Sequence, residues 1–120
     1  MIHRTCVALL LVIVSSVFAS AAETRCGWLE NPTPGNWWLT DRDGSWTLMT
    51  QGEDYREEVM DNVPPFNDAQ YVATNGNYGY GCACLSVDVD KADGRIVKVY
   101  SGKAISLNKC EADRSLKRPE

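Results

Sequence analysis

Apolar and polar side chains alternate most regularly along residues 78–90, whose sequence is YGYGCACLSVDVD. Residues two apart in an extended strand point to the same face, so this segment predicts a strand that is used on both faces. Cys82 and Cys84 share one face. The other face is apolar and consists of Ala83, Leu85, Val87 and Val89. We therefore expect the apolar face in the core and the cysteine face in disulfide bonds.

Residues 37–49 carry a second pattern, two apolar segments around an Asp-Arg-Asp-Gly loop, which predicts a hairpin. The expected register pairs Leu39 with Trp46. It also pairs Trp37 with Leu48, so that apolar side chains meet on one face of the hairpin.

The rest of the chain has shorter patterns. We expect a turn at 31–36, a helical segment at 51–62, a strand at 69–74, a hairpin loop at 75–77, a strand at 95–101 and a helical turn at 105–116 around Cys110. Together these elements predict an all-β domain with little α content. The fold is an antiparallel meander or a small barrel of five to six strands, with a short helical turn near the C-terminus.

The hairpin formed by residues 85–101 has two competing registers. A regular turn sets Val87 against Lys98, whereas a one-residue bulge near Gly94 sets Val87 against Val97. Both registers remain open at the level of the sequence.

The first 22 residues have the pattern of a secretory signal peptide. Arg4 precedes an apolar run at residues 6–18, and small residues follow at 19–22. The apolar run is too short for a membrane span. We therefore expect residues 1–22 to be removed and residues 23–120 to form one soluble domain, in the periplasm or secreted. Removing 22 of the 120 residues leaves 98, which is the size of a single domain.

Four cysteines remain when Cys6 leaves with the signal peptide, and an even number in an exported chain indicates two disulfides. The four are Cys26, Cys82, Cys84 and Cys110. A bond between Cys82 and Cys84 would close a very small ring, so we favour the two pairings that tie the central strand to both termini. The spacing lacks the C-x2-C pairs of a zinc site, so no metal is expected.

The charge of the domain is acidic. Arg4 is the only charged side chain lost with the signal peptide, so 11 basic and 16 acidic residues leave a net charge of −5. An acidic chain binds polyphosphates poorly, which argues against nucleic acid as a partner. Residues 88–94 match a calcium loop only in part, because Ala92 stands where an oxygen ligand belongs, and we expect no cofactor.

The sequence argues against an enzyme. His3, the single histidine, lies in the signal peptide, and oxidised cysteines provide no thiolate nucleophile. Asp41 with Asp43, and Glu57 with Glu58, are the nearest carboxylate pairs, but turns and exposed helix faces use such residues for ordinary reasons.

The domain has more large aromatic residues than one small core usually needs: Trp28, Trp37, Trp38, Trp46, Tyr71, Tyr78 and Tyr80. Strand alternation places Trp38 on the face opposite Trp37, where it could stack on a sugar or anchor a protein. We expect a binding surface that includes Trp38, Trp28, Tyr78 and Tyr80. The alternative is that tryptophan simply fills the core of a domain that has little phenylalanine.

Four stretches of the chain resemble one known family. They are RCGW near residue 25, NPTPGNWWLTDRDGSW from residue 31, GYGCACLSV in the central strand, and SGKAISLNKCEAD near the C-terminus. Together they are similar to a family of small exported bacterial proteins of unknown function. The resemblance implies a bacterial origin and a periplasmic or secreted location, and it implies no activity.

Two functions fit these observations. The first is a binding or inhibitor module that acts on an exported protein, because small disulfide-bonded β domains often serve this purpose. The second is a domain that binds glycans or another small ligand through exposed aromatic side chains. In either case we expect a monomer.

Overall fold

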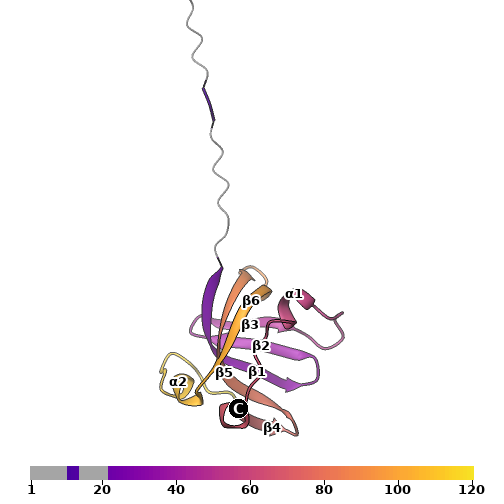
Figure 1. Ribbon diagram of the computed structural model, residues 1–120, viewed down its shortest axis with the longest axis vertical. Helices are drawn as coiled ribbons and strands as arrows, with labels where there is room; N and C mark the ends of the chain where they lie inside the picture. Colours follow the sequence, from indigo (N-terminus) through magenta and orange to yellow (C-terminus); the bar gives the residue numbers. More distant parts are fainter. Residues whose placement is uncertain (1–10, 14–21) are drawn as a thin grey trace, which may run out of the picture.

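The computed structural model describes residues 11–13 and 22–120 and contains six strands (Figure 1). The strands are β1 (Glu23–Thr33), β2 (Asn36–Asp41), β3 (Gly44–Met49), β4 (Tyr71–Asn75), β5 (Tyr78–Asp90) and β6 (Arg95–Ile105). Three short helical segments accompany them, α1 (Glu57–Met60), the 3-10 helix η1 (Asp68–Gln70) and α2 (Leu107–Glu111). The predicted all-β class, with a helical turn near the C-terminus, is confirmed.

The sheet closes into a small barrel. Its order is β1-β2-β3-β6-β5-β4, and β1 also pairs with β5, so β1, β2, β3, β6 and β5 form a ring. The ring closes between β3 and β6 by a parallel contact, in which the Thr47 backbone N–H donates to the Gly94 carbonyl at 2.9 Å. The helix α1 follows β3. This strand order, with its single parallel junction, is that of the OB-fold barrel.

The barrel interior holds the larger hydrophobic core. Its buried members are Leu29, Leu39, Trp46, Leu48, Val59, Ala83, Leu85, Val87, Ile96 and Val99. Val59 comes from α1 and is fully buried, so this single helical turn contributes to the core. Residues 83, 85 and 87 are therefore on the apolar face that the alternation of β5 predicts, and Val89 packs against the same core.

A second, smaller core lies on the outer face of β1 and β5. Trp28, Tyr80, Cys82 and Cys110 are buried there, and Leu107 and Leu116 of the C-terminal segment pack against them. Figure 1 shows α2 and α1 on opposite sides of the barrel. The C-terminal segment thus covers one outer face that would otherwise be solvated.

Two disulfides tie the central strand to both ends of the domain. Cys26 bonds to Cys84, and Cys82 bonds to Cys110, across 58 and 28 residues of sequence. The expected type of pairing, one bond to each terminus, is confirmed. Such bonds are typical of an oxidising, extracellular environment.

The hairpin of β5 and β6 begins with Asp90 opposite Arg95, as the regular register predicts, but the partner of Val87 differs from both predicted alternatives. Val87 pairs with Val99, and the register shifts twice inside the strands rather than near Gly94. The irregularity allows Ile96 and Val99, which are three residues apart, both to face the core. Val97 is displaced to the surface, where it is 38% exposed.

The first hairpin agrees with the prediction only in part. Leu39 pairs with Trp46 as expected, but Trp37 pairs with Met49 instead of Leu48. The cause is a register shift between Trp37 and Trp38. Leu48 still points into the core, and Trp37 packs against that core while only partly buried.

The turn predicted at 31–36 is present but shorter, because β1 continues to Thr33 and β2 begins at Asn36. Pro32 lies inside β1, at a register shift between Glu30 and Thr33 where no ladder hydrogen bond is needed from its nitrogen. The turn is shorter than expected and centres on Gly35, whose φ of 74° favours glycine. The one or two helical turns expected within 51–62 are present as a single turn, Glu57–Met60.

The expected signal peptide, residues 1–22, lies outside the described residues apart from residues 11–13 and 22. In the part of the chain that the structure describes, no helix has the length and apolar character to cross a membrane.

Candidate functional site

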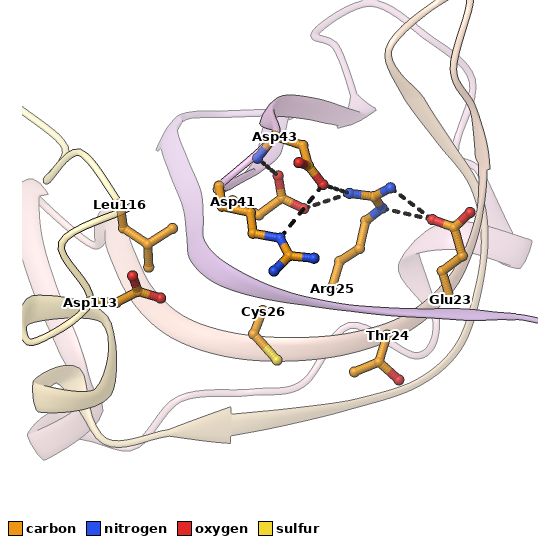
Figure 2. Close-up of a pocket in the computed structure, with 9 residues that line it drawn as sticks. Glu23, Thr24, Arg25, Cys26, Asp41, Asp43, Asp113 and Leu116 are labelled. Atoms are coloured by element: carbon orange, nitrogen blue, oxygen red, sulfur yellow. Dashed lines mark hydrogen bonds and ion pairs between the residues drawn. The ribbon is translucent and has the colours of Figure 1, made fainter.

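A cleft of about 390 Å³ lies beside the start of β1 (Figure 2). Three segments form its walls, the first residues of β1, the turn between β2 and β3, and the C-terminal segment. The lining residues are Glu23, Thr24, Arg25, Cys26, Asp41, Arg42, Asp43, Asp113 and Leu116.

The cleft exists because β1 and β2 separate. Their pairing runs only from Trp28 to Thr33 on β1, whereas β1 continues beside β5 as far as Glu23. The two strands touch closely at Gly27, where an added Cβ would lie 2.1 Å from the Thr40 carbonyl oxygen. Only glycine fits at this close approach. The space between the diverging strands, on the N-terminal side of Gly27, forms the cleft.

Arg25 connects the two walls of the cleft (Figure 2). Its Nη1 donates to Asp41 Oδ2 at 2.8 Å and to Asp43 Oδ2 at 3.1 Å. Its Nε and Nη2 donate to Glu23 Oε2 at 3.1 and 2.7 Å. The guanidinium also lies 4.1 Å from the ring centroid of Trp46, within the range of a cation–π interaction.

Asp41 is the most buried charged residue of the cleft, only 6% exposed. Its second oxygen, Oδ1, accepts from Trp46 Nε1 at 3.1 Å and from the Asp43 backbone N–H at 2.8 Å. Both oxygens are therefore occupied, and the carboxylate fixes the turn after β2.

The charge of Arg25 is stabilised by its partners. Burial disfavours the charged guanidinium, but the hydrogen bonds to Asp41, Glu23 and Asp43 outweigh this, and the pKa of Arg25 is raised above its ordinary value.

The lining as a whole is acidic. Four carboxylates, from Glu23, Asp41, Asp43 and Asp113, face two guanidiniums, which leaves a formal charge of −2. Hydrogen bonds from the Ser115 hydroxyl and backbone lower the pKa of Asp113. Among the described residues, no group of three or more Asp, Glu, His or Cys side chains is placed to hold a metal ion.

Trp38 lies on the outer face of β2, as alternation predicts, and is half-buried. Its Nε1 donates to Glu30 Oε2 at 2.6 Å, and the Thr40 hydroxyl donates to the same oxygen at 2.7 Å. One carboxylate oxygen thus holds both the indole and the hydroxyl in fixed positions, and part of the indole surface stays accessible.

Two of the four predicted surface aromatics are wrong. Trp28 is 1% exposed and Tyr80 is 5% exposed. Their rings make an edge contact with centroids 5.2 Å apart, beneath the C-terminal segment. Arg118 Nε donates to the Tyr80 hydroxyl at 3.2 Å, which helps to hold that segment in place. Tyr78 is half-buried at the start of β5, so of the four predicted residues Trp38 and Tyr78 keep substantial accessible surface.

The ion pair between Arg25 and Asp41 was not predicted from the sequence, where Asp41 and Asp43 were considered only as neighbouring carboxylates. The alternation of side chains along β2 nevertheless indicates that Asp41 needs a partner. Asp41 follows Leu39 by two residues and so continues the core-facing side of β2. A charged residue at a core-facing position requires a partner of opposite charge, which Arg25 provides.

Comparisons with known proteins identify a family without a known activity. No curated protein and no solved structure matches the chain. A family model described as protein of unknown function (DUF4087) matches residues 20–117. That match covers most of the chain, so this protein belongs to the DUF4087 family of proteins of unknown function.

Proposed function

We propose that the protein is a non-catalytic binding module of the periplasm or the extracellular space, and that the cleft between β1 and β2 contacts an exported protein partner. The observation that carries this proposal is the arrangement of charges around Arg25. Glu23 and Asp43 reach the rim of the cleft and are held there by Arg25. A partner then pays little entropy to order these side chains.

The same arrangement favours binding over catalysis. Asp41 accepts hydrogen bonds from Arg25, Trp46 and the Asp43 backbone, which supports a structural role for its carboxylate in holding the turn and the two strands. All four cysteines of the domain are in disulfides. The domain that would follow a 22-residue signal peptide contains no histidine.

The test compares the proteins retained by two charge-reversed variants. Asp43→Arg changes the rim of the cleft, and Asp68→Arg makes the same charge change at the exposed start of η1. Each variant is immobilised and exposed to periplasmic extract of the producing bacterium. We expect a protein that the parent and Asp68→Arg retain and that Asp43→Arg loses. Retention that is the same on both variants would refute a role for the cleft.

A second candidate function is glycan binding at Trp38. The outer face of the second and third strands is the side on which OB-fold barrels bind oligosaccharides. Trp38, Glu30 and Thr40 lie on that face of β2 and the neighbouring β1, and a half-exposed indole beside a carboxylate suits a pyranose ring. Because the C-terminal segment covers Trp28 and Tyr80, this surface has a single accessible tryptophan. We therefore place it second.

A further inference from the structure

The spacing of the disulfide-bonded residues Cys26 and Cys84 indicates which way the backbone N–H and C=O groups of β1 point. Cys26 and Cys84 are directly opposite each other, with their Cα atoms 4.0 Å apart. In antiparallel strands, so short a separation marks a pair whose N–H and C=O groups do not bond to each other but point outward. The N–H and C=O of Cys26 are therefore directed away from β5. The same holds for Thr24, two residues earlier, because the direction alternates along a strand.

Among residues 11–13 and 22–120, no strand pairs with these outward groups. The pairing of β2 with β1 begins only at Trp28. In the described part of the chain, no backbone hydrogen bond outside the strand ladders involves residues 23–26. Thr24 and Cys26 are exposed, and both line the cleft. The cleft therefore contains an open strand edge.

We propose that the cleft binds its partner by strand addition: an extended segment of the partner, carrying lysine or arginine, pairs with the strand edge at residues 23–26. This inference rests on the proposed function and names how the same site recognises its partner. Main-chain hydrogen bonds to Thr24 and Cys26 supply affinity, as in other complexes formed at sheet edges. The side chains of the segment face the walls of the cleft.

The charge of the cleft selects the segment. The acidic excess of the lining favours a basic side chain near Asp43 and Asp113, which lie on the walls opposite and beside the edge. A second copy of this chain fits the edge poorly. Two copies joined edge to edge would bring two acidic clefts together, and like charges across an interface cost binding energy.

The test removes one edge donor. Thr24→Pro deletes the outward N–H of residue 24 and leaves the ladder between β1 and β5 intact, since proline is tolerated where the N–H faces away from the partner strand. Thr24→Ala keeps the N–H and measures the contribution of the side chain alone. Both variants are first checked for two disulfides and for a cooperative thermal transition.

The probe is a phage library of random decapeptides, selected against the disulfide-bonded protein purified from an exporting host. We expect enriched peptides that alternate basic with β-branched residues. Their affinity should fall about tenfold in Thr24→Pro relative to Thr24→Ala, the effect of one lost hydrogen bond together with the steric bulk of the ring. Equal affinity of the two variants, or a failure to enrich any peptide, would overturn strand addition.

Hydrogen exchange gives a readout that does not depend on a substitution. The Cys26 amide should exchange rapidly in the unbound protein and slow at least severalfold when a selected peptide is bound. Rapid exchange in the complex would place the peptide elsewhere. A dimer of the protein without peptide, with the Cys26 amide already protected, would show that a second copy occupies the edge and would also refute the proposal.

Failure of this inference is distinguishable from failure of the proposed function. If Asp43→Arg loses a natural protein partner while Thr24→Pro retains it as Thr24→Ala does, the cleft is a binding site and strand addition is wrong. If Asp43→Arg and Asp68→Arg behave alike, both proposals fail.

Discussion

Arg25 donates to Asp41 across 2.8 Å, and the two side chains are only 10% and 5% exposed. This ion pair joins the start of β1 to the end of β2, two strands that no longer pair with each other at that point. It is therefore the main polar connection across the base of the cleft.

Breaking this pair should destabilise the fold strongly. Arg25→Met leaves Asp41 buried without its cation, and the expected loss is about 3 kcal/mol, near the lower end for buried pairs because Trp46 and the Asp43 backbone still bond to Asp41. Urea denaturation of the purified protein measures this. Arg42→Met is the matched control, since Arg42 is 79% exposed and should cost less than about 0.5 kcal/mol. Equal losses in the two variants would contradict a structural role for Arg25.

Glu53 makes stability depend on pH. The Thr50 backbone N–H donates to Glu53 Oε2 at 2.6 Å and, with the Thr50 hydroxyl and Arg95, lowers the pKa of Glu53 below its ordinary value of 4.5. A carboxyl whose pKa is lower in the folded state stabilises the fold above its unfolded pKa, and this stability is lost as the pH falls through the folded pKa. The advantage of the parent over Glu53→Gln should therefore shrink from about pH 6 to about pH 3.

The measurement is the free energy of unfolding of both proteins across that pH range. Glu57→Gln serves as the control, because Glu57 is exposed and makes no side-chain hydrogen bond or ion pair within the described residues. An advantage over Glu53→Gln that stayed constant down to pH 3 would contradict a lowered pKa.

The Cys82–Cys110 disulfide should hold the C-terminal segment over Trp28. Replacing both cysteines with serine opens a 28-residue loop, and the chain-entropy model gives a loss of about 3 to 4 kcal/mol. The segment should then loosen, and water should reach the Trp28 indole. We expect tryptophan fluorescence to shift to longer wavelength. The shift should disappear in a Trp28→Phe background, and its persistence there would show that another tryptophan had been exposed.

Much of the fold could be predicted from local pattern. The alternation of β5 identified the apolar face correctly because that strand faces a core throughout its second half. The strand β1 was missed for a physical reason. Gly27, Trp28 and Leu29 are consecutive buried residues, since both faces of β1 are covered, and a strand covered on both faces shows no alternation.

The site was harder to predict than the fold because it depends on contacts between distant segments. Trp28 and Tyr80 have the side chains of a binding surface, and only the position of α2 and the residues after it buries them. The cleft likewise depends on the divergence of β1 from β2 on the N-terminal side of Gly27, where residues 23–26 no longer pair with β2. The sequence contains no local sign of that divergence other than the glycine itself.

Trp38 distinguishes a core role from a recognition role. Its indole is half-buried and bonded to Glu30, so Trp38→Ala should cost about 1 to 2 kcal/mol, from one hydrogen bond to a charged group and part of the buried area. Trp28→Ala, in the fully buried position, should cost about 3 to 5 kcal/mol. Denaturation of the two variants compares them directly. Equal losses would make Trp38 a core residue.

Binding measurements on Trp38 variants distinguish the two proposed functions. Trp38→Phe keeps an aromatic face but removes the N–H that Glu30 accepts. If the outer face of β2 binds glycans by stacking, chitotriose or cellotriose should bind the parent and Trp38→Phe, and Trp38→Ala should lose that binding because no ring remains. If the cleft is the recognition site, Trp38→Ala should retain the protein partner that Asp43→Arg loses. The two surfaces are built from different residues, so each substitution should impair one function and spare the other.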